Sequence, residues 1–152
     1  MKKIFILFVA LFFYSLSTWA QIEKPVTWEF TAKKISDKKY EIHAIATIQN
    51  KWHVYAQEAG DGPVSTSFVF SKNPLVKLEG KVTEQGKAKF AYDKNFDSKL
   101  KFYENKVDFV QKLTLKTKAN TIIKGTVNFM VCNDQKCLPP TDVSFSVKLE
   151  DK

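Results

Sequence analysis

The chain has 152 residues and a formal net charge of +8 at pH 7, and all 24 of its basic residues are lysines. The planar guanidinium of arginine is the usual group for recognising phosphates and base edges, so its absence argues against a nucleic-acid-binding protein. The lysines are scattered, which is typical of a solvated basic surface. The other interpretation is a weak attraction to acidic partners or to an anionic membrane surface.

The first twenty residues have the pattern of a cleaved secretory signal peptide. Two lysines precede the apolar run Ile4–Leu16, and the stretch "STWA" ends at Ala20. A membrane-spanning helix needs roughly 20 apolar residues, more than this run supplies, and an uncleaved anchor is the alternative. We expect residues 1–20 to be removed on export, which leaves 132 residues (21–152), enough for one domain.

Alternation of apolar and polar side chains with a period of two dominates residues 21–152, and no twelve-residue window carries a helical stripe. Turn-forming stretches such as "SDKK", "GDGP" and "TEQG" separate the alternating segments. The expected strands are Thr27–Lys33, 39–48, Trp52–Ala56, Ser67–Phe70, Val76–Lys81, Ala88–Tyr92, 106–117, 125–132 and 141–149. Eight or nine short strands in one domain predict an all-β fold, an immunoglobulin-like two-sheet β-sandwich.

The same alternation predicts which side chains face the core. In the segment 39–48 every second residue is apolar and should be buried. In 125–132 the pattern places Cys132 on the outward face. The alternation slips near Val110–Lys112, which predicts a β-bulge at that point.

The two cysteines of the chain, Cys132 and Cys137, lie together in the stretch "VCNDQKCLPP" and can pair across a short hairpin loop. A disulfide that closes so short a loop stabilises a fold by only about 2 kcal/mol, against about 4.7 kcal/mol for a 100-residue loop. Such a bond is poorly placed as a staple and well placed for thiol chemistry in an oxidising compartment. The residues alone leave a structural and a redox-active bond about equally open.

Other uses of paired cysteines fit less well. Covalent haem attachment needs a C-x-x-C-H run, which is missing, and a zinc site needs four ligands, whereas His43 and His53 are far away in the sequence. A copper site made from Cys132, Met130 and a histidine has no spacing motif behind it. Hydrolase motifs are also missing. We therefore expect neither a metal nor a cofactor.

Three stretches resemble the N-terminal periplasmic domains of thiol–disulfide interchange proteins of the DsbD type. They are "KWHVYAQEAGDGPVSTSFVF", similar to an aromatic strand and the loop after it; "KNFDSKLKFYENKVDF", similar to a cap loop; and "CNDQKCLPP", similar to the cysteine loop. Together they span residues 51–140, and the cysteine loop with its two prolines is the most specific. The expected strand count agrees with the immunoglobulin-like fold of this family.

The resemblance implies an electron relay. A domain of this family receives electrons from a thioredoxin-like donor and passes them to oxidised periplasmic thiol proteins, including disulfide isomerases and cytochrome c maturation factors. By position, Cys137 would form the bond with the partner, and Cys132 would resolve the mixed disulfide. Such a chain would be a protein-disulfide reductase component rather than a stand-alone enzyme.

The resemblance also assigns residues around the cysteines. Phe96 would be a cap that covers the pair, and Tyr55 and His53 would line the site together with Asp93. Each has a structural alternative, because aromatic side chains also fill sandwich cores and a histidine can be a surface residue. The chain departs from some members, which have five residues between the cysteines and an acidic pair directly before the cap aromatic. Here Lys94 and Asn95 stand directly before Phe96, and Asp93 lies one position further back.

The chain ends at Lys152, without the membrane-embedded and thioredoxin-like parts of the family, so we expect electrons to come from a separate protein. We expect a periplasmic monomer that contacts the membrane only through a partner. The alternative is a secreted β-sandwich binding module with a purely structural disulfide. Its candidate contacts would be exposed aromatic side chains, such as Trp28 and Trp52.

Overall fold

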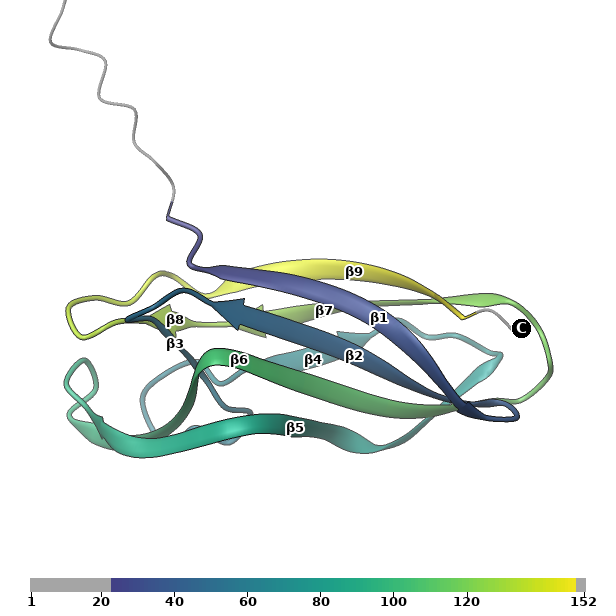
Figure 1. Cartoon of the computed structure of the whole chain (residues 1–152), viewed down its shortest axis with the longest axis horizontal. Helices are drawn as coiled ribbons and strands as arrows, with labels where there is room; N and C mark the ends of the chain where they lie inside the picture. Colours follow the sequence, from purple (N-terminus) through teal and green to yellow (C-terminus); the bar gives the residue numbers. More distant parts are fainter. Residues whose placement is uncertain (1–22, 150–152) are drawn as a thin grey trace, which may run out of the picture.

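A computed structural model describes residues 23–149, which form two antiparallel β-sheets and no helix (Figure 1). The strands are β1 (Val26–Ser36), β2 (Lys39–Ile48), β3 (His53–Tyr55), β4 (Ser67–Phe70), β5 (Val76–Asp93), β6 (Ser98–Leu115), β7 (Thr121–Phe129), β8 (Val131–Cys132) and β9 (Thr141–Leu149). One sheet has the order β1-β2-β6-β3-β8, with β5 also paired to β6, and the other has the order β4-β7-β9. The predicted all-β, immunoglobulin-like two-sheet sandwich is confirmed.

The core lies between the two sheets, and the period-two pattern of β2 contributes one wall of it. The inward-facing Ala44 and Ala46 are 3% and 0% exposed, so the predicted core face of this segment is confirmed. Small alanines leave room for large rings from other strands. The ring of Trp28 lies 5.8 Å from that of Phe109 and 5.2 Å from that of Phe129. This aromatic packing joins β1, β6 and β7.

The strand β5 differs from the prediction. The segments Val76–Lys81 and Ala88–Tyr92 are parts of one 18-residue strand, and the predicted turn "TEQG" lies inside it. Its partner β6 begins earlier than expected, at Ser98. The residues 83–86 pair with β6 in regular register, and register shifts flank them between Glu79 and Thr83 and between Gly86 and Ala88. Pairing with β6 therefore overrides the local turn signal, because strand formation depends on neighbouring strands more than on intrinsic preference.

The irregularity predicted at Val110–Lys112 lies on β5 and not on β6. The residues 110–112 pair with β2 without a register shift. On the other side of β6, three residues of β5, 80–82, lie opposite the single residue Gln111. Gln111 is buried, and its Nε2 donates to the carbonyls of Glu79 at 3.1 Å and Lys112 at 2.7 Å. The break in the hydrophobic pattern thus marks a buried amide that satisfies backbone acceptors at the irregularity.

Two connections meet at one end of the sandwich (Figure 1). They are the turn at residues 94–97, which joins β5 to β6, and the loop at residues 133–140, which joins β8 to β9. The short strand β3 lies between them in the sheet, because it pairs with β6 on one side and with β8 on the other. Side chains of β3 can therefore contact both connections.

The described part of the chain begins at Glu23 and ends at Leu149. The predicted signal peptide, residues 1–20, lies outside it. Within residues 23–149 the structure contains no apolar helix of the length that a membrane crossing requires.

Candidate functional site

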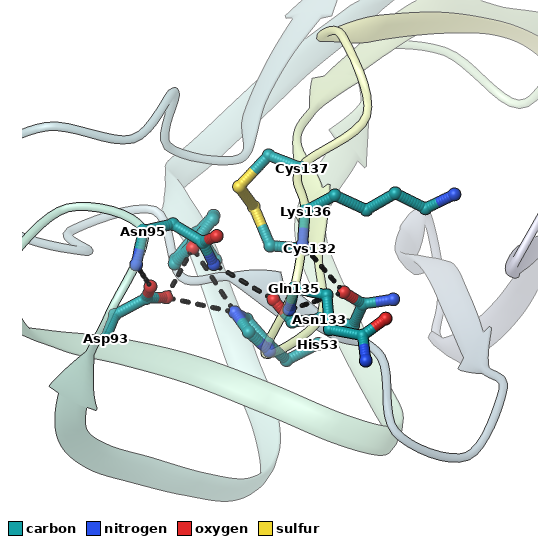
Figure 2. The surroundings of a disulfide bond; sticks show 9 residues. His53, Asp93, Asn95, Cys132, Asn133, Gln135, Lys136 and Cys137 are labelled. Carbon is teal, nitrogen blue, oxygen red and sulfur yellow. Dashed lines mark hydrogen bonds and ion pairs between the residues drawn. A yellow bond between two sulfur atoms is a disulfide. The ribbon is translucent and has the colours of Figure 1, made fainter.

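Cys132 and Cys137 face each other across a four-residue turn and form a disulfide bond (Figure 2). Backbone hydrogen bonds of 2.9 Å flank the pair on both sides, one of them from the Asn133 N–H to the Lys136 carbonyl. This is the pattern of a non-hydrogen-bonded antiparallel pair, in which opposite residues approach most closely. The two Cα atoms are 4.0 Å apart, so the backbone of the turn itself brings the sulfurs together.

The turn is stabilised by its own sequence. The Oδ1 atom of Asn133 accepts hydrogen bonds from the backbone N–H groups of Gln135 and Lys136, both at 2.9 Å. Asparagine is favoured at this position because its short side chain can bond to the backbone two residues ahead. Pro139 and Pro140 follow and have no N–H to donate, so the chain leaves the turn without continuing the ladder.

The two cysteines differ in burial. Cys132 is 0% exposed, whereas Cys137 is partly exposed. The prediction that Cys132 faces outward is therefore wrong. The reason is that the chain changes sheets at Met130, where β7 ends in one sheet and β8 begins in the other, so the alternation of 125–132 does not run through the break. Cys137 is therefore the more accessible of the two cysteines.

A buried polar cluster of His53, Tyr55 and Asp93 lies next to the cysteine turn. Figure 2 labels His53 and Asp93 beside that turn. His53 is the direct cross-strand neighbour of Cys132 in the β3–β8 ladder. The Asp93 Oδ2 atom accepts a hydrogen bond of 2.6 Å from the Tyr55 hydroxyl and lies 3.1 Å from His53 Nε2. His53 and Tyr55 share a face because they are two residues apart on one strand, and the end of β5 brings Asp93 to them.

Burial sets the charge state of this cluster. Burial lowers the pKa of His53, and the nearby Asp93 offsets this only in part. Burial opposes the ionisation of Asp93, but hydrogen bonds from Tyr55, the Asn95 N–H and His53 outweigh it and lower the pKa of Asp93. Burial and Asp93 raise the pKa of Tyr55. At neutral pH the cluster therefore carries one negative charge, on Asp93.

Phe96 lies in the turn between β5 and β6, and its side chain is partly buried. It packs on an apolar cluster that includes Tyr55, Leu100 and Cys132, and its ring meets the Tyr55 ring edge-on at 5.8 Å. The loop after β3 closes the other side: a Cβ atom at Gly62 would lie 2.8 Å from Phe96 Cδ1. Phe96 thus occupies a slot between the loop and the cluster to which Cys132 belongs.

Asn95, the residue before Phe96, bonds to both sides of the site. Its backbone N–H donates to Asp93 Oδ1 at 2.8 Å, and its side-chain Nδ2 donates to the Asn133 carbonyl at 2.9 Å (Figure 2). Sequence reasoning missed both asparagines as site residues. The Asn-Asp pair at Asn133 carries a turn signal that could have been used. Asn95 carries no such signal, because its partner is 38 positions away.

The remaining candidates lie elsewhere. His43 is on β2, where its Nδ1 lies 2.7 Å from Asp108 Oδ2 on β6. Trp28 packs in the aromatic core and Trp52 is 9% exposed, so neither is the exposed contact that the binding-module alternative requires. Among residues 23–149 no three His, Cys, Asp or Glu side chains gather as they would around a metal ion.

Comparison with known families identifies the chain. A family model described as "Thiol:disulfide interchange protein DsbD, N-terminal" matches residues 21–149. The chain belongs to this family. The resemblance of the cysteine loop and the two stretches before it to DsbD N-terminal domains is thereby confirmed. A search of curated proteins finds no match.

Two solved structures share the fold of this DsbD N-terminal family member. The N-terminal periplasmic domain of ScsB from Proteus mirabilis has a TM-score of 0.62 and 16% identity, over 86% of this chain and 49% of that one. The DsbD N-terminal domain of Neisseria meningitidis in the reduced form has a TM-score of 0.54 and 15% identity, over 87% of this chain and 91% of that one. This chain therefore spans about half the length of the Proteus mirabilis chain.

Proposed function

We propose that this chain is a periplasmic thiol–disulfide interchange domain that relays reducing equivalents through Cys132 and Cys137. The observation that carries the proposal is the unequal burial of the two cysteines, with Cys137 partly exposed and Cys132 at 0% exposure. A purely structural disulfide does not need an accessible sulfur, whereas thiol–disulfide exchange requires one. Membership of the DsbD N-terminal family supports the same function.

The unequal burial also supports a division of roles. In the reduced domain the Cys137 thiolate attacks one sulfur of a partner's disulfide, and the partner's other sulfur leaves as a thiolate that takes up a proton. The Cys132 thiolate then attacks Cys137 Sγ, re-forms the intramolecular disulfide and releases the partner's second thiol. Two electrons and two protons pass to the partner. Cys132 is too deeply buried for a partner to attack but is bonded to Cys137 in the oxidised state.

Phe96 is the proposed cap of this pair. It packs on the apolar cluster that contains Cys132, yet it sits in a turn at the end of a hairpin and not in a strand between the sheets. A turn can move without separating the sheets, because stability is lowest at loops with few buried contacts. Displacement of Phe96 would widen a partner's access to Cys137. His53, Tyr55 and Asp93 line the site below it.

The proposed partners are thiol proteins. The electron donor would be a thioredoxin-like protein or domain, linked to a membrane component, and the acceptors would be oxidised periplasmic proteins. The domain would act as a protein-disulfide reductase component, since the two cysteines carry the electrons and no cofactor takes part. The periplasm supplies the oxidised acceptors that such a relay needs.

The reduction potential of the Cys132–Cys137 bond tests the function. Purified protein would be equilibrated in graded thiol–disulfide buffers, trapped by alkylation and read by mass spectrometry. We expect a value between about −180 and −270 mV, the range of exchange proteins. A value well below about −300 mV would indicate a structural bond and would favour the binding-module alternative.

Single cysteine variants test the division of roles. Cys132→Ser keeps the more accessible thiol. It should accumulate a mixed disulfide with a thioredoxin-like protein that lacks its resolving cysteine and whose attacking cysteine carries a thionitrobenzoate leaving group. Cys137→Ser is the matched control and should trap little, because Cys132 is buried. Equal trapping by both variants, or more trapping by Cys137→Ser, would contradict the assignment.

A further inference from the structure

The hairpin turn that carries Phe96 is attached to the rest of the domain at two points of different strength. The first attachment is the Asp93 carboxylate, whose side chain is 2% exposed and which accepts hydrogen bonds from the Tyr55 hydroxyl and the Asn95 N–H. The second attachment is the hydrogen bond from Asn95 Nδ2 to the Asn133 carbonyl, which lies on the exposed surface. Figure 2 shows both attachments on either side of Asn95.

The buried attachment is costly to break. Separating Asp93 from its partners would leave an ionised carboxylate unpaired in a largely buried site, and buried polar groups carry a large penalty when they lose their partners. His53 Nε2, 3.1 Å from Asp93 Oδ2, would lose its partner as well. We expect Asp93 to stay in place whenever the domain is folded.

The exposed attachment is inexpensive to break. When Asn95 Nδ2 leaves the Asn133 carbonyl, water can bond to both groups, so little more than the net value of one hydrogen bond is lost. Within residues 23–149 it is the hydrogen bond that joins the 94–97 turn to the cysteine turn. The remaining contact of the turn on this side is the packing of Phe96.

We propose that Asn95 is a positioning residue, a releasable latch that holds the Phe96 turn closed over the cysteine pair while Asp93 acts as the fixed hinge. This inference rests on the proposed exchange function and adds the residue that controls access to it. Opening breaks one exposed hydrogen bond and slides Phe96 off its apolar cluster, while the Asp93 cluster stays intact.

The latch acts on the cysteine turn itself. Its acceptor belongs to Asn133, the residue that follows Cys132 and whose side chain holds the backbone of Gln135 and Lys136 in the turn. A thiolate that approaches Cys137 therefore meets a cysteine turn that is hydrogen-bonded to the closed Phe96 turn. In the domain without the latch, the cysteine turn keeps its internal bonds but loses its link to the cap.

The reaction that reports on the latch is reduction of the disulfide by dithiothreitol. One reagent thiolate attacks Cys137 Sγ, the Cys132–Cys137 bond breaks, and Cys132 leaves as a thiolate that takes up a proton. The second reagent thiol then displaces Cys137 as a thiol, and the reagent ends as its cyclic disulfide. Two electrons and two protons move from the reagent to the protein.

The test compares rates of this reduction at fixed pH and reagent concentration. Asn95→Ala removes the amide donor and should raise the rate about fivefold, the factor that corresponds to one exposed hydrogen bond of about 1 kcal/mol. Asn95→Asp keeps the size but cannot donate at neutral pH, so it should raise the rate at least as much. Lys94→Ala, on the exposed neighbour in the same turn, is the matched control and should leave the rate unchanged.

A second measurement separates a latch from a purely structural role. The reduction rates are also measured in urea below the unfolding transition. Opening of the Phe96 turn exposes little surface, so the faster rates of the Asn95 variants should change little with urea, whereas reduction through unfolding would accelerate steeply. The latch is refuted if both Asn95 variants reduce within twofold of wild type, or if their faster reduction rises with urea as steeply as unfolding does. The reduction potential is measured independently of these rates. A potential well below about −300 mV, typical of a structural disulfide, would refute the exchange function but would not change the conclusion about Asn95.

Discussion

Gly62 lies against the ring of Phe96, so close that a Cβ atom at position 62 would be 2.8 Å from Phe96 Cδ1. Gly62 also has a φ of +117°, a conformation that other residues rarely adopt. We predict that Gly62→Ala pushes Phe96 out of its slot and raises the rate of disulfide reduction by dithiothreitol several-fold. Alkylation-quenched time courses would measure this rate.

Gly60→Ala is the matched control for this variant. Gly60 has a similar φ of +111°, but its added Cβ would meet Leu100 Cδ2 at 3.0 Å rather than Phe96. Backbone strain is therefore comparable in the two variants, and only one of them displaces Phe96. Equal reduction rates in both variants would show that strain in the loop, and not the position of Phe96, controls access to the disulfide.

Phe96→Ala should expose the disulfide directly. Because Phe96 is only partly buried, we expect a loss in unfolding free energy of about 1–2 kcal/mol, below the 3–5 kcal/mol of a fully buried phenylalanine. Reduction by small thiols should become clearly faster. Urea denaturation and the reduction assay give the two numbers. A loss of several kcal/mol with an unchanged reduction rate would place Phe96 in the core and refute the cap.

His53 should make stability depend on pH. Its folded pKa is below the ordinary value of 6.5, so as the pH falls below about 7 the unfolded chain binds a proton first and the free energy of unfolding decreases. We predict that the stability difference between wild type and His53→Gln shrinks from pH 7.5 to pH 5, as measured by urea unfolding. This window lies above the range in which Asp93, with its lowered pKa, takes up a proton.

The pH comparison uses the difference between two proteins because their exposed carboxylates titrate alike and cancel. A difference that stays constant or grows toward pH 5 would mean that His53 is protonated at least as easily in the folded domain as in the unfolded chain. The burial of His53 beside the cysteine turn would then not control its charge.

Glu84 should stabilise the loop that forms one wall of the Phe96 slot. Its side chain is 10% exposed and accepts hydrogen bonds from the Gln57 N–H at 2.6 Å, Lys101 Nζ at 2.7 Å and the Tyr103 hydroxyl at 2.7 Å. We predict that Glu84→Gln lowers the unfolding free energy by about 2 kcal/mol, since hydrogen bonds to charged groups are worth about 1.5–3 kcal/mol. Urea denaturation at pH 7 would measure the loss.

Glu79→Gln is the control for that prediction. Glu79 is on the same strand, its side chain is 43% exposed, and it forms an ion pair of 3.5 Å with the exposed Lys77. Surface pairs of this kind contribute little, so the change should stay within about 0.5 kcal/mol. If both variants lost the same amount, the loss would reflect strand β5 in general and not the anchoring of the loop.

The local alternation of apolar and polar residues was sufficient to predict several strands of the sandwich. The strands 39–48 and 141–149 have the predicted bounds, because period-two alternation is a property of adjacent residues and survives wherever one face is buried. The pairing of Cys132 with Cys137 could also be predicted from the sequence, because a turn as short as 133–136 leaves the two cysteines opposite each other. These features depend on contacts between residues close in sequence.

Tertiary structure decided the rest of the site. The burial of Cys132 depends on the change of sheets at Met130, which alternation along a single strand does not record. The contact of His53 with Asp93 spans 40 positions, and it forms because β5 continues through a predicted turn to reach β3. Sequence by itself therefore determined that Cys132 and Cys137 pair across a short turn. Only the packing of distant strands decided which of the two cysteines is buried, because burial depends on what each strand contacts across the fold.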